Sequence, residues 1–297
     1  MTRTALIAGQ GALPRRVAQA LAGTDWFACH LDGALPEGVG QSRGFRLEGL
    51  GSFIAGLKND GVDQVVFAGR IVRPSVDPSR VDAATQPLLP RITDALQDGD
   101  DGALRALIAT FEDAGLTVVA PQDLDPSMTA LPLARQPSER DLEDIARAVD
   151  VHGALSPLDV GQGVVVAQGQ VLAIEAAPGT DFMLATLAKQ PPQPPRPAGA
   201  GAFDLFGGAA DWLSGGSVPS GLPSFEKPAG GVFFKAPKLG QDRRIDLPVV
   251  GPDTIRRCAA AGLNGLALED GGVLVLEPED VAAQLRSTGL FLSAWSR

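Results

Sequence analysis

Charged residues crowd into one short stretch in the second half of the chain, KAPKLGQDRRIDLPVVGPDT (235–254). This stretch carries Lys235, Lys238, Asp242, Arg243, Arg244 and Asp246, with Gln241 among them. Cations in such a cluster can clamp a diphosphate and stabilise the charge that develops in phosphoryl transfer. Carboxylates can hold Mg²⁺, which prefers oxygen ligands and often shares them with substrate phosphates. The stretch therefore predicts a site for a phosphorylated substrate, with a charged surface loop as the alternative.

A second candidate site lies near the N-terminus, where the apolar run 5–8 stops at Gly9-Gln10-Gly11-Ala12-Leu13. A helix-like stretch then starts at Pro14. Two glycines let the backbone approach a phosphate at a helix N-terminus. The third glycine of the dinucleotide fingerprint is missing, although Asp32 stands where a ribose-binding acid would lie. The turn therefore predicts either a nucleotide or sugar-phosphate site or a purely structural turn, which Pro14 also suits.

Two smaller groups could contribute to the same chemistry. FAGRIVRPS (67–75) ends a predicted strand with Gly69, Arg70 and Arg73. Open α/β sheets bind ligands beyond the carboxyl ends of their strands, so arginines there suit an anion, unless they lie on a solvated loop. Thr180-Asp181 opens a predicted helix, where Asp181 is either another acid of the site or a residue favoured by the helix dipole.

Strands and helices alternate over the first 130 residues of the chain. The apolar patterns predict strands at 4–9, 26–32, 62–69 and 116–121, and helices at 14–22, 49–60 and 103–115. This alternation predicts a parallel, Rossmann-like α/β domain. A helix is predicted next at 138–155, with Ser138 as its N-cap and an apolar face made of Leu142, Ile145, Ala146 and Val149.

The pattern changes after this helix. A hairpin is predicted at 161–176, and a helix at 179–189 with Thr180 as a candidate N-cap. A strand is predicted at 230–238. Residues 252–295 are predicted to form a helix, two strands, a helix and a strand, in that order. We therefore predict an α/β protein with a Rossmann-like domain at 1–131, a mixed α+β catalytic domain at 132–297 and a ligand cleft between them. Residues 190–229 are rich in Pro and Gly and are predicted to form a mobile insertion.

Composition narrows the functional classes. The net charge of −10 disfavours nucleic acid as a partner, because binding to its backbone needs clustered Lys and Arg. Two cysteines without a metal-ligand spacing suit a reducing, cytoplasmic setting. No signal peptide or spanning segment is predicted. Tyrosine is absent and the two histidines are interpreted as structural, so carboxylates, cations and a metal would have to carry any catalysis.

Six blocks of the sequence, in order, carry a resemblance to a known family. They are LIAGQGALP, FAGRIVRP, GDDGALRALI, DVGQGVVV, EAAPGTDFML and KAPKLGQDRRIDLPVVGPDTI. Together they resemble the bacterial UDP-2,3-diacylglucosamine diphosphatases of the I type, once known as a domain of unknown function. The resemblance covers about 4–187 and 230–292, and the Pro/Gly-rich insertion departs from it.

The resemblance implies a cytoplasmic hydrolase of lipid A biosynthesis. Such enzymes cleave UDP-2,3-diacylglucosamine to 2,3-diacylglucosamine 1-phosphate and UMP, by attack of water on the α phosphorus. It also implies a required divalent cation, Mg²⁺ or Mn²⁺, and two domains that hold the lipid sugar between them. Peripheral contact with the inner membrane, the acyl-chain preference and the oligomeric state are left open.

Residue roles combine this resemblance with the charge pattern. We expect Asp242 to be the leading acid, as metal ligand or general base, and Asp246 and Asp181 to assist it. Asp246 is also expected to be a metal ligand, and Arg243 and Lys235 are expected to be catalytic cations. The residues expected to bind substrate are Gly9, Gly11, Ala12, Leu13, Gly69, Arg70, Thr180, Asp181, Lys238 and Gln241. Gly9 and Gly11 are expected to present backbone N–H groups to the ligand.

Two alternatives from other functional classes remain open. The glycine turn and Asp32 would suit an NAD(P)-dependent oxidoreductase, which the missing third glycine and the lack of an evident His or Tyr proton donor weaken. The second alternative is a non-catalytic module that binds nucleotide sugars or lipids. Release of UMP separates the hydrolase from both.

Overall fold

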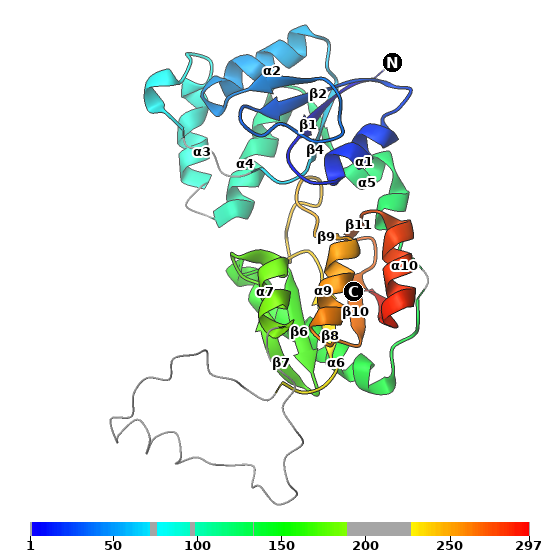
Figure 1. Ribbon diagram of the computed structural model, residues 1–297. Coiled ribbons are helices and arrows are strands. Elements are labelled where there is room, and N and C mark those ends of the chain that lie inside the picture. Colours follow the sequence, from blue (N-terminus) through cyan, green and yellow to red (C-terminus); the bar gives the residue numbers. More distant parts are fainter. Residues whose placement is uncertain (1, 72–75, 96–98, 133, 189–226, 297) are drawn as a thin grey trace, which may run out of the picture.

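The computed structural model describes residues 2–71, 76–95, 99–132, 134–188 and 227–296. Arg73 and most of the 190–229 insertion lie outside these ranges. Figure 1 shows two lobes, with the chain up to α5 in the upper lobe and the chain from α6 onward mainly in the lower one. The boundary predicted after residue 131 falls in the connection between them, before α6 begins.

The first lobe is built on a sheet of five parallel strands in the order β3-β2-β1-β4-β5. Its strands are β1 (Arg3–Ala8), β2 (Asp25–Leu31), β3 (Ser42–Phe45), β4 (Gln64–Ala68) and β5 (Thr117–Val119), and its helices are α1 (Leu13–Ala20), α2 (Leu50–Asn59), α3 (Leu89–Ala95), α4 (Gly99–Asp113) and α5 (Pro121–Leu124). Ala5 and Ile7 of β1 pack in one core with α2 and α4, while Leu6 and Ala8 pack in the other with α1. A parallel sheet buried on both faces confirms the Rossmann-like prediction.

The second lobe has a mixed sheet in the order β12-β10-β8-β6-β7. Its strands are β6 (Gly163–Ala167), β7 (Gln170–Ile174), β8 (Val232–Lys235), β10 (Gly265–Glu269) and β12 (Phe291–Trp295), and its helices are α6 (Glu139–Leu155), α7 (Gly179–Ala188), α9 (Pro252–Ala260) and α10 (Pro278–Thr288). Strands β8, β10 and β12 are parallel, whereas β6 is antiparallel to both of its neighbours. This confirms the predicted mixed α+β character.

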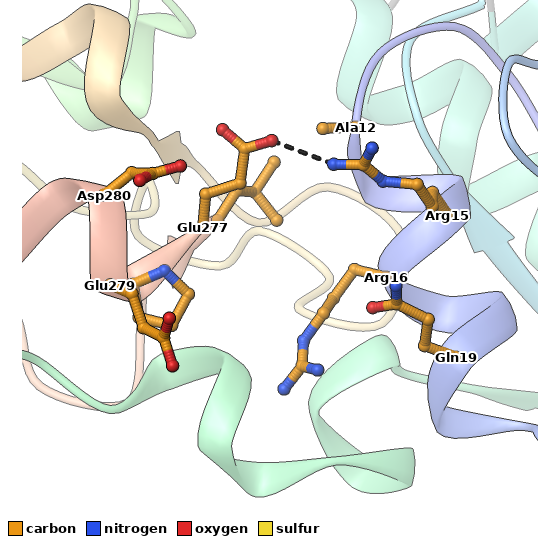
Figure 2. A pocket seen from close by; sticks show the side chains of 9 residues that line it. Ala12, Arg15, Arg16, Gln19, Glu277, Glu279 and Asp280 are labelled. Carbon is orange, nitrogen blue, oxygen red and sulfur yellow. Dashed lines mark hydrogen bonds and ion pairs between the residues drawn. The ribbon is translucent and has the colours of Figure 1, made fainter.

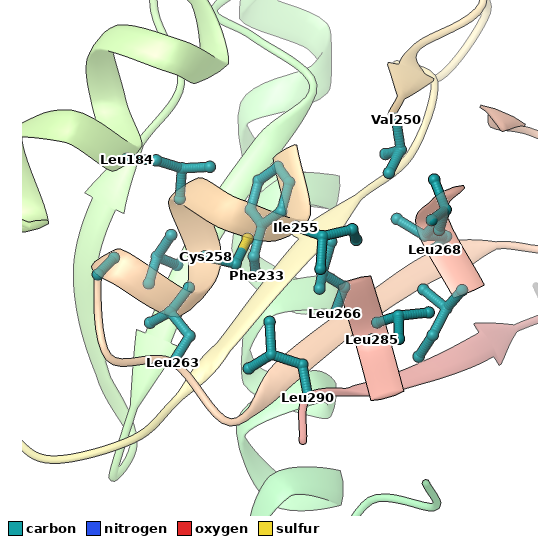
Figure 3. Close-up of a cluster of buried hydrophobic side chains, with 14 of the residues drawn as sticks. Leu184, Phe233, Val250, Ile255, Cys258, Leu263, Leu266, Leu268, Leu285 and Leu290 are labelled. Atoms are coloured by element: carbon teal, nitrogen blue, oxygen red, sulfur yellow. The ribbon is translucent and has the colours of Figure 1, made fainter. Parts of the chain in front are cut away.

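Helices cover both faces of the mixed sheet. Ile145 and Ala148 of α6 pack against Phe234 on one face. On the other face, α7, α9 and α10 share a larger core with the strands. Figure 3 shows part of this core, where Leu184, Ile255, Leu285 and their neighbours gather around Phe233 and Leu266. The rigid sheet fixes the residues that follow its strands.

Several local features differ from the sequence predictions. Strand β3 was not predicted, nor was β9 (Val249–Val250), which pairs in parallel with β11 (Leu274–Val275). On α6, the predicted face is confirmed at Ile145 and Val149, which pack in the core, and wrong at Leu142, which is 51% exposed, and at Ala146, which is also exposed. Two carboxylates, Asp141 and Asp144, are buried beside the apolar residues. Thr180 lies at the second residue of α7 rather than before it.

The segment between β8 and α9 reaches from the second lobe to the first, and Figure 1 shows β9 and β11 between the two lobes. Leu247 and Leu274 share a buried cluster with Leu6 and Ala8 of β1. Ile245 packs against the other core of the first lobe. The charge-rich stretch singled out in the sequence therefore lies where the two lobes meet. Within the described part of the chain, no helix combines the length and apolar character needed to cross a membrane.

Candidate active site

The turn that follows β1 is tied to the loop that follows β4. Gln10 and Arg70 exchange two backbone hydrogen bonds of 2.9 Å. A Cβ on Gly9 would lie 2.6 Å from the carbonyl oxygen of Arg70, and one on Gly69 would lie 2.7 Å from that of Gln10. The two loops therefore approach so closely that only glycine fits at both positions, whatever ligand they bind.

The amides of this turn divide into two groups. Gly9 donates its N–H to the carbonyl of Ala68 at 2.8 Å, so its expected role as a donor to the ligand does not fit this structure. The N–H groups of Gly11, Ala12 and Leu13 make no hydrogen bond to a described backbone carbonyl, and α1 begins at Leu13. They can serve as phosphate donors at a helix N-terminus. Arg70 is exposed, and its backbone is bridged to Gln10 of the turn.

Lys235 ends β8 at the carboxyl edge of the mixed sheet, and its side chain is 6% exposed. Its Nζ donates a 2.6 Å hydrogen bond to Thr180 Oγ1 and lies 3.6 Å from Glu175 Oε2. Burial lowers the pKa of the Lys235 ammonium, while the negative charges of Glu175, Asp181 and Asp246 oppose that shift. The structure thus brings Lys235 and Thr180 into contact, as a shared site requires.

Gln241 organises the loop after β8. Its Oε1 accepts hydrogen bonds from the Lys238 amide at 2.9 Å and from Gln162 Nε2 at 3.1 Å. Its Nε2 donates to the carboxylate and the backbone carbonyl of Asp246. The Lys238 ammonium contacts Asp159. Gln241 is therefore a buried anchor of the loop, and Lys238 is held at its edge by an acid that was not predicted.

Asp242 is held by Arg244. Arg244 Nε and Nη2 donate to the carboxylate at 3.0 Å and 2.7 Å, and the Arg244 amide donates at 3.0 Å. These hydrogen bonds lower the pKa of Asp242, so the carboxylate is ionised at neutral pH. Arg244 also pairs with Glu112 of α4 at 2.6 Å, which joins this loop to the first lobe. An ionised, oriented carboxylate suits either a metal ligand or a base for water.

Two acids of this edge, Glu175 and Glu269, were missed by the sequence analysis. Arg243 pairs with Glu269, the last residue of β10, whose side chain is 5% exposed. Glu175 directly follows β7 and Glu269 ends β10. Both strands read as apolar, and neither glutamate lies within the charge-rich stretch 235–254. Asp181, by contrast, is 66% exposed and pairs with Arg257 Nε at 3.0 Å, so its contact to the site is electrostatic.

The carboxylates at this edge can be tested for their fit to a divalent cation. No group of three or more His, Cys, Asp and Glu side chains among the described residues is placed to hold a metal ion. Asp242 is already bound to Arg244, and Asp246 accepts from Gln241. Mg²⁺ commonly takes one or two carboxylates and completes its shell with water and substrate phosphates. The described carboxylates therefore do not form a protein-only cage for a metal ion.

A pocket of about 460 Å³ opens between the lobes, next to the glycine turn. It is lined by Ala12, Arg15, Arg16 and Gln19 from the first lobe and by Leu276, Glu277, Pro278, Glu279 and Asp280 from the second. Figure 2 shows Arg15 and Glu277 meeting across it, with 2.9 Å between Nη2 and Oε1. The pocket has the volume of a ligand site, and Ala12 is the expected substrate-binding residue that lines it.

Comparison with known families covers both lobes. A model of the LpxI N-terminal domain matches residues 3–128, and a model of the LpxI C-terminal domain matches residues 129–293. The chain belongs to the LpxI family. One curated relative, the UDP-2,3-diacylglucosamine pyrophosphatase LpxI of Caulobacter vibrioides, is 33% identical over 301 aligned positions, which cover 98% of this chain and 97% of the relative. The resemblance drawn from the six sequence blocks is therefore confirmed.

Among solved structures, a glycinamide-RNase-transformylase T from Mycobacterium tuberculosis is similar to this LpxI-family chain at 21% sequence identity. The match covers 59% of this chain and 44% of that one, with a TM-score of 0.20. The chain thus spans less than half of that protein, and the likeness carries no argument about the fold or the activity.

Proposed function

We propose that this chain hydrolyses the pyrophosphate bond of UDP-2,3-diacylglucosamine in lipid A biosynthesis. The products would be UMP and 2,3-diacylglucosamine 1-phosphate. The match to a pyrophosphatase of that name over nearly the whole of both chains carries the proposal. In the reaction, the oxygen of water bonds to one phosphorus of the diphosphate. The bond from this phosphorus to the bridging oxygen breaks, the other phosphate leaves with that oxygen, and one proton is released.

The arrangement of charges supports this chemistry. Lys235 and Lys238 stand at the carboxyl edge of the second sheet, and Arg243 lies on the loop after it. Cations placed in this way neutralise a diphosphate and stabilise its leaving group. The ionised Asp242 carboxylate, fixed by Arg244, is our candidate for orienting the attacking water or holding a metal ion.

We further propose that the reaction needs Mg²⁺ or Mn²⁺. Asp242 and Asp246 would hold the ion together with the substrate diphosphate. The ion would supply positive charge that neutralises the diphosphate oxygens. This part of the proposal rests on the two carboxylates of one loop and on the resemblance, and removal of the metal tests it directly.

A cytoplasmic location and contact with the inner membrane complete the proposal. Leu158 is 69% exposed and Leu239 is 52% exposed. They flank Asp159 and Lys238 in sequence, and the contact between those two side chains brings their loops together. Exposed leucines beside the expected phosphate-binding cation Lys238 suit acyl chains that emerge from the site.

The test is release of UMP from UDP-2,3-diacylglucosamine in Mg²⁺, with and without a chelator. We expect wild-type turnover that stops with chelator and returns when Mg²⁺ is restored. Asp242→Ala should lower the rate by at least about 100-fold. Asp150→Ala is the matched control, because Asp150 is exposed on α6. Folded wild-type protein that releases no UMP would overturn the hydrolase, and an active Asp242→Ala variant would overturn the role of that acid.

A further inference from the structure

Glu175 lies at the centre of three sequence blocks that come together at one edge of the second sheet. It follows β7, and its Oε1 accepts a 2.8 Å hydrogen bond from Thr180 Oγ1. The same hydroxyl accepts the 2.6 Å hydrogen bond from Lys235 Nζ. The Lys235 ammonium also stands 3.6 Å from Glu175 Oε2. The three side chains therefore form a closed triangle built from the ends of β7 and β8 and the start of α7.

The strand opposite Glu175 makes room for its carboxylate. A Cβ on Gly163 would lie 2.6 Å from Glu175 Oε2, and a Cβ on Gly161 would lie 2.1 Å from the Glu175 carbonyl oxygen. Neither glycine has the positive φ that would by itself require glycine. The two glycines of DVGQGVVV thus have a steric purpose, which is to let Glu175 sit against β6.

The triangle is well buried, but its ammonium and carboxylate do not form a short ion pair. The Glu175 side chain is 12% exposed and that of Lys235 is 6% exposed. Glu175 Oε2 is buried and accepts no hydrogen bond from any described residue. The Lys235 ammonium has three protons, of which one is donated to Thr180 and one faces Glu175 Oε2. The third is left to donate to another acceptor.

We infer that Glu175 is a positioning residue, which holds the Lys235 ammonium and the Thr180 hydroxyl so that Lys235 donates to the diphosphate of the substrate. This inference rests on the proposed function and assigns a role within the same site. Glu175 acts through Lys235 and does not itself touch the substrate. Its negative charge and its contact with Thr180 set where the ammonium lies.

The test compares wild type with Glu175→Gln and Lys235→Met, singly and combined. Glutamine keeps the size of the side chain and an acceptor for Thr180, but it removes the charge. We expect Glu175→Gln to lower kcat about tenfold, by more than it raises KM. The substitution should cost less than about twofold in the Lys235→Met background, because a residue that acts through another loses its effect when that residue is gone.

Two controls separate a positioning role from a structural one. Glu143→Gln removes a carboxylate from an exposed ion pair on α6 and should leave kcat unchanged. Thermal unfolding of each variant shows how much protein is folded. If Lys235→Met alone fails to fold, because it strands the Glu175 charge, the double variant replaces both partners and remains usable. Wild-type kcat in folded Glu175→Gln, or additive losses in the double variant, would overturn the inference.

Calorimetric binding of inorganic pyrophosphate separates this inference from the proposed function. We expect Glu175→Gln to weaken pyrophosphate binding by at least about threefold. If Glu175→Gln binds pyrophosphate more weakly than wild type but wild type releases no UMP, the hydrolase is overturned and the positioning role is kept. If wild type releases UMP and Glu175→Gln has the pyrophosphate affinity and the kcat of wild type, the positioning role is overturned and the hydrolase is kept. Absence of both UMP release and pyrophosphate binding in folded wild type would overturn both.

Discussion

At the scale of residues, the two glycines of the first turn meet different physical demands. Gly9 has a backbone neighbour where a side chain would begin, because a Cβ there would lie 2.6 Å from Arg70 O. Gly11 has open space around its Cβ position but a φ of +96°, which L-residues rarely adopt. The first glycine therefore lets two loops pack closely together, and the second allows the backbone conformation at the start of α1.

These demands predict different costs for the same substitution. Gly9→Ala should destabilise the fold by at least about 2 kcal/mol, because backbone atoms cannot give way as a flexible side chain does. Gly11→Ala should cost about 1 kcal/mol from backbone strain alone. Urea unfolding of both variants measures the difference. Equal costs, or a larger cost at Gly11, would contradict this account of the turn.

The candidate site was only partly predictable from the sequence. The cluster of charged residues in the sequence identifies Lys235 and Asp242 as candidate site residues, because residues close in sequence remain close in a loop. Glu175 and Glu269 lie outside that cluster, since each comes at the end of an apolar strand and reaches the site only when the sheet forms. Closely spaced glycines before β6 were a usable sign that another chain segment approaches there, although they could not say which one.

At the scale of elements, α6 shows how carboxylates are buried beside an apolar face. Asp141 accepts from the Ser138 amide at 2.9 Å and from Asn264 Nδ2 at 2.8 Å, which ties the start of α6 to the start of β10. Asp144 accepts from the amides of Gln168 and Gly169 in the β6–β7 turn. The N-cap Ser138 was predicted correctly, because capping is local. The buried face was predicted only in part, since carboxylates enter an interior only when distant amides satisfy them.

The pH dependence of stability should report the Asp141 contacts. Burial raises the pKa of this carboxyl, but hydrogen bonds from Ser138 and Asn264 outweigh it, so the folded pKa lies below the ordinary value. The stabilisation is therefore present above the unfolded pKa of about 4 and is lost as the pH falls through the folded pKa. Asp141→Ala should cost about 2–3 kcal/mol at pH 7.

Urea unfolding of wild type and Asp141→Ala at pH 7 and pH 3 measures this effect. The stability difference between the two proteins should shrink at the lower pH. Asp150→Ala, on the exposed side of the same helix, should show little difference at either pH. A difference that grows at pH 3 would mean that Asp141 is held in its protonated form.

At the scale of the whole molecule, apolar contacts rather than ion pairs should join the two lobes. Leu274 is 1% exposed and lies in the cluster that holds Leu6 and Ala8 of β1. Arg15 and Glu277 also bridge the lobes, but their side chains are 51% and 41% exposed. Exposed ion pairs contribute little, because water already solvates both charges and salt screens their attraction. The same interface carries the charge-rich loop, so the stability of the interface and the geometry of the site are linked.

This contrast predicts how the lobes separate on heating. Leu274→Ala should cost about 2–4 kcal/mol through the lost apolar contact and the cavity it leaves. It should also split a single calorimetric transition into two, because each lobe keeps its own sheet and core while the contact between them weakens. Arg15→Ala should change the stability by less than about 1 kcal/mol and leave one transition. If Arg15→Ala split the transition and Leu274→Ala did not, the ion pair would be the main link between the lobes, and the pocket that it crosses would depend on salt.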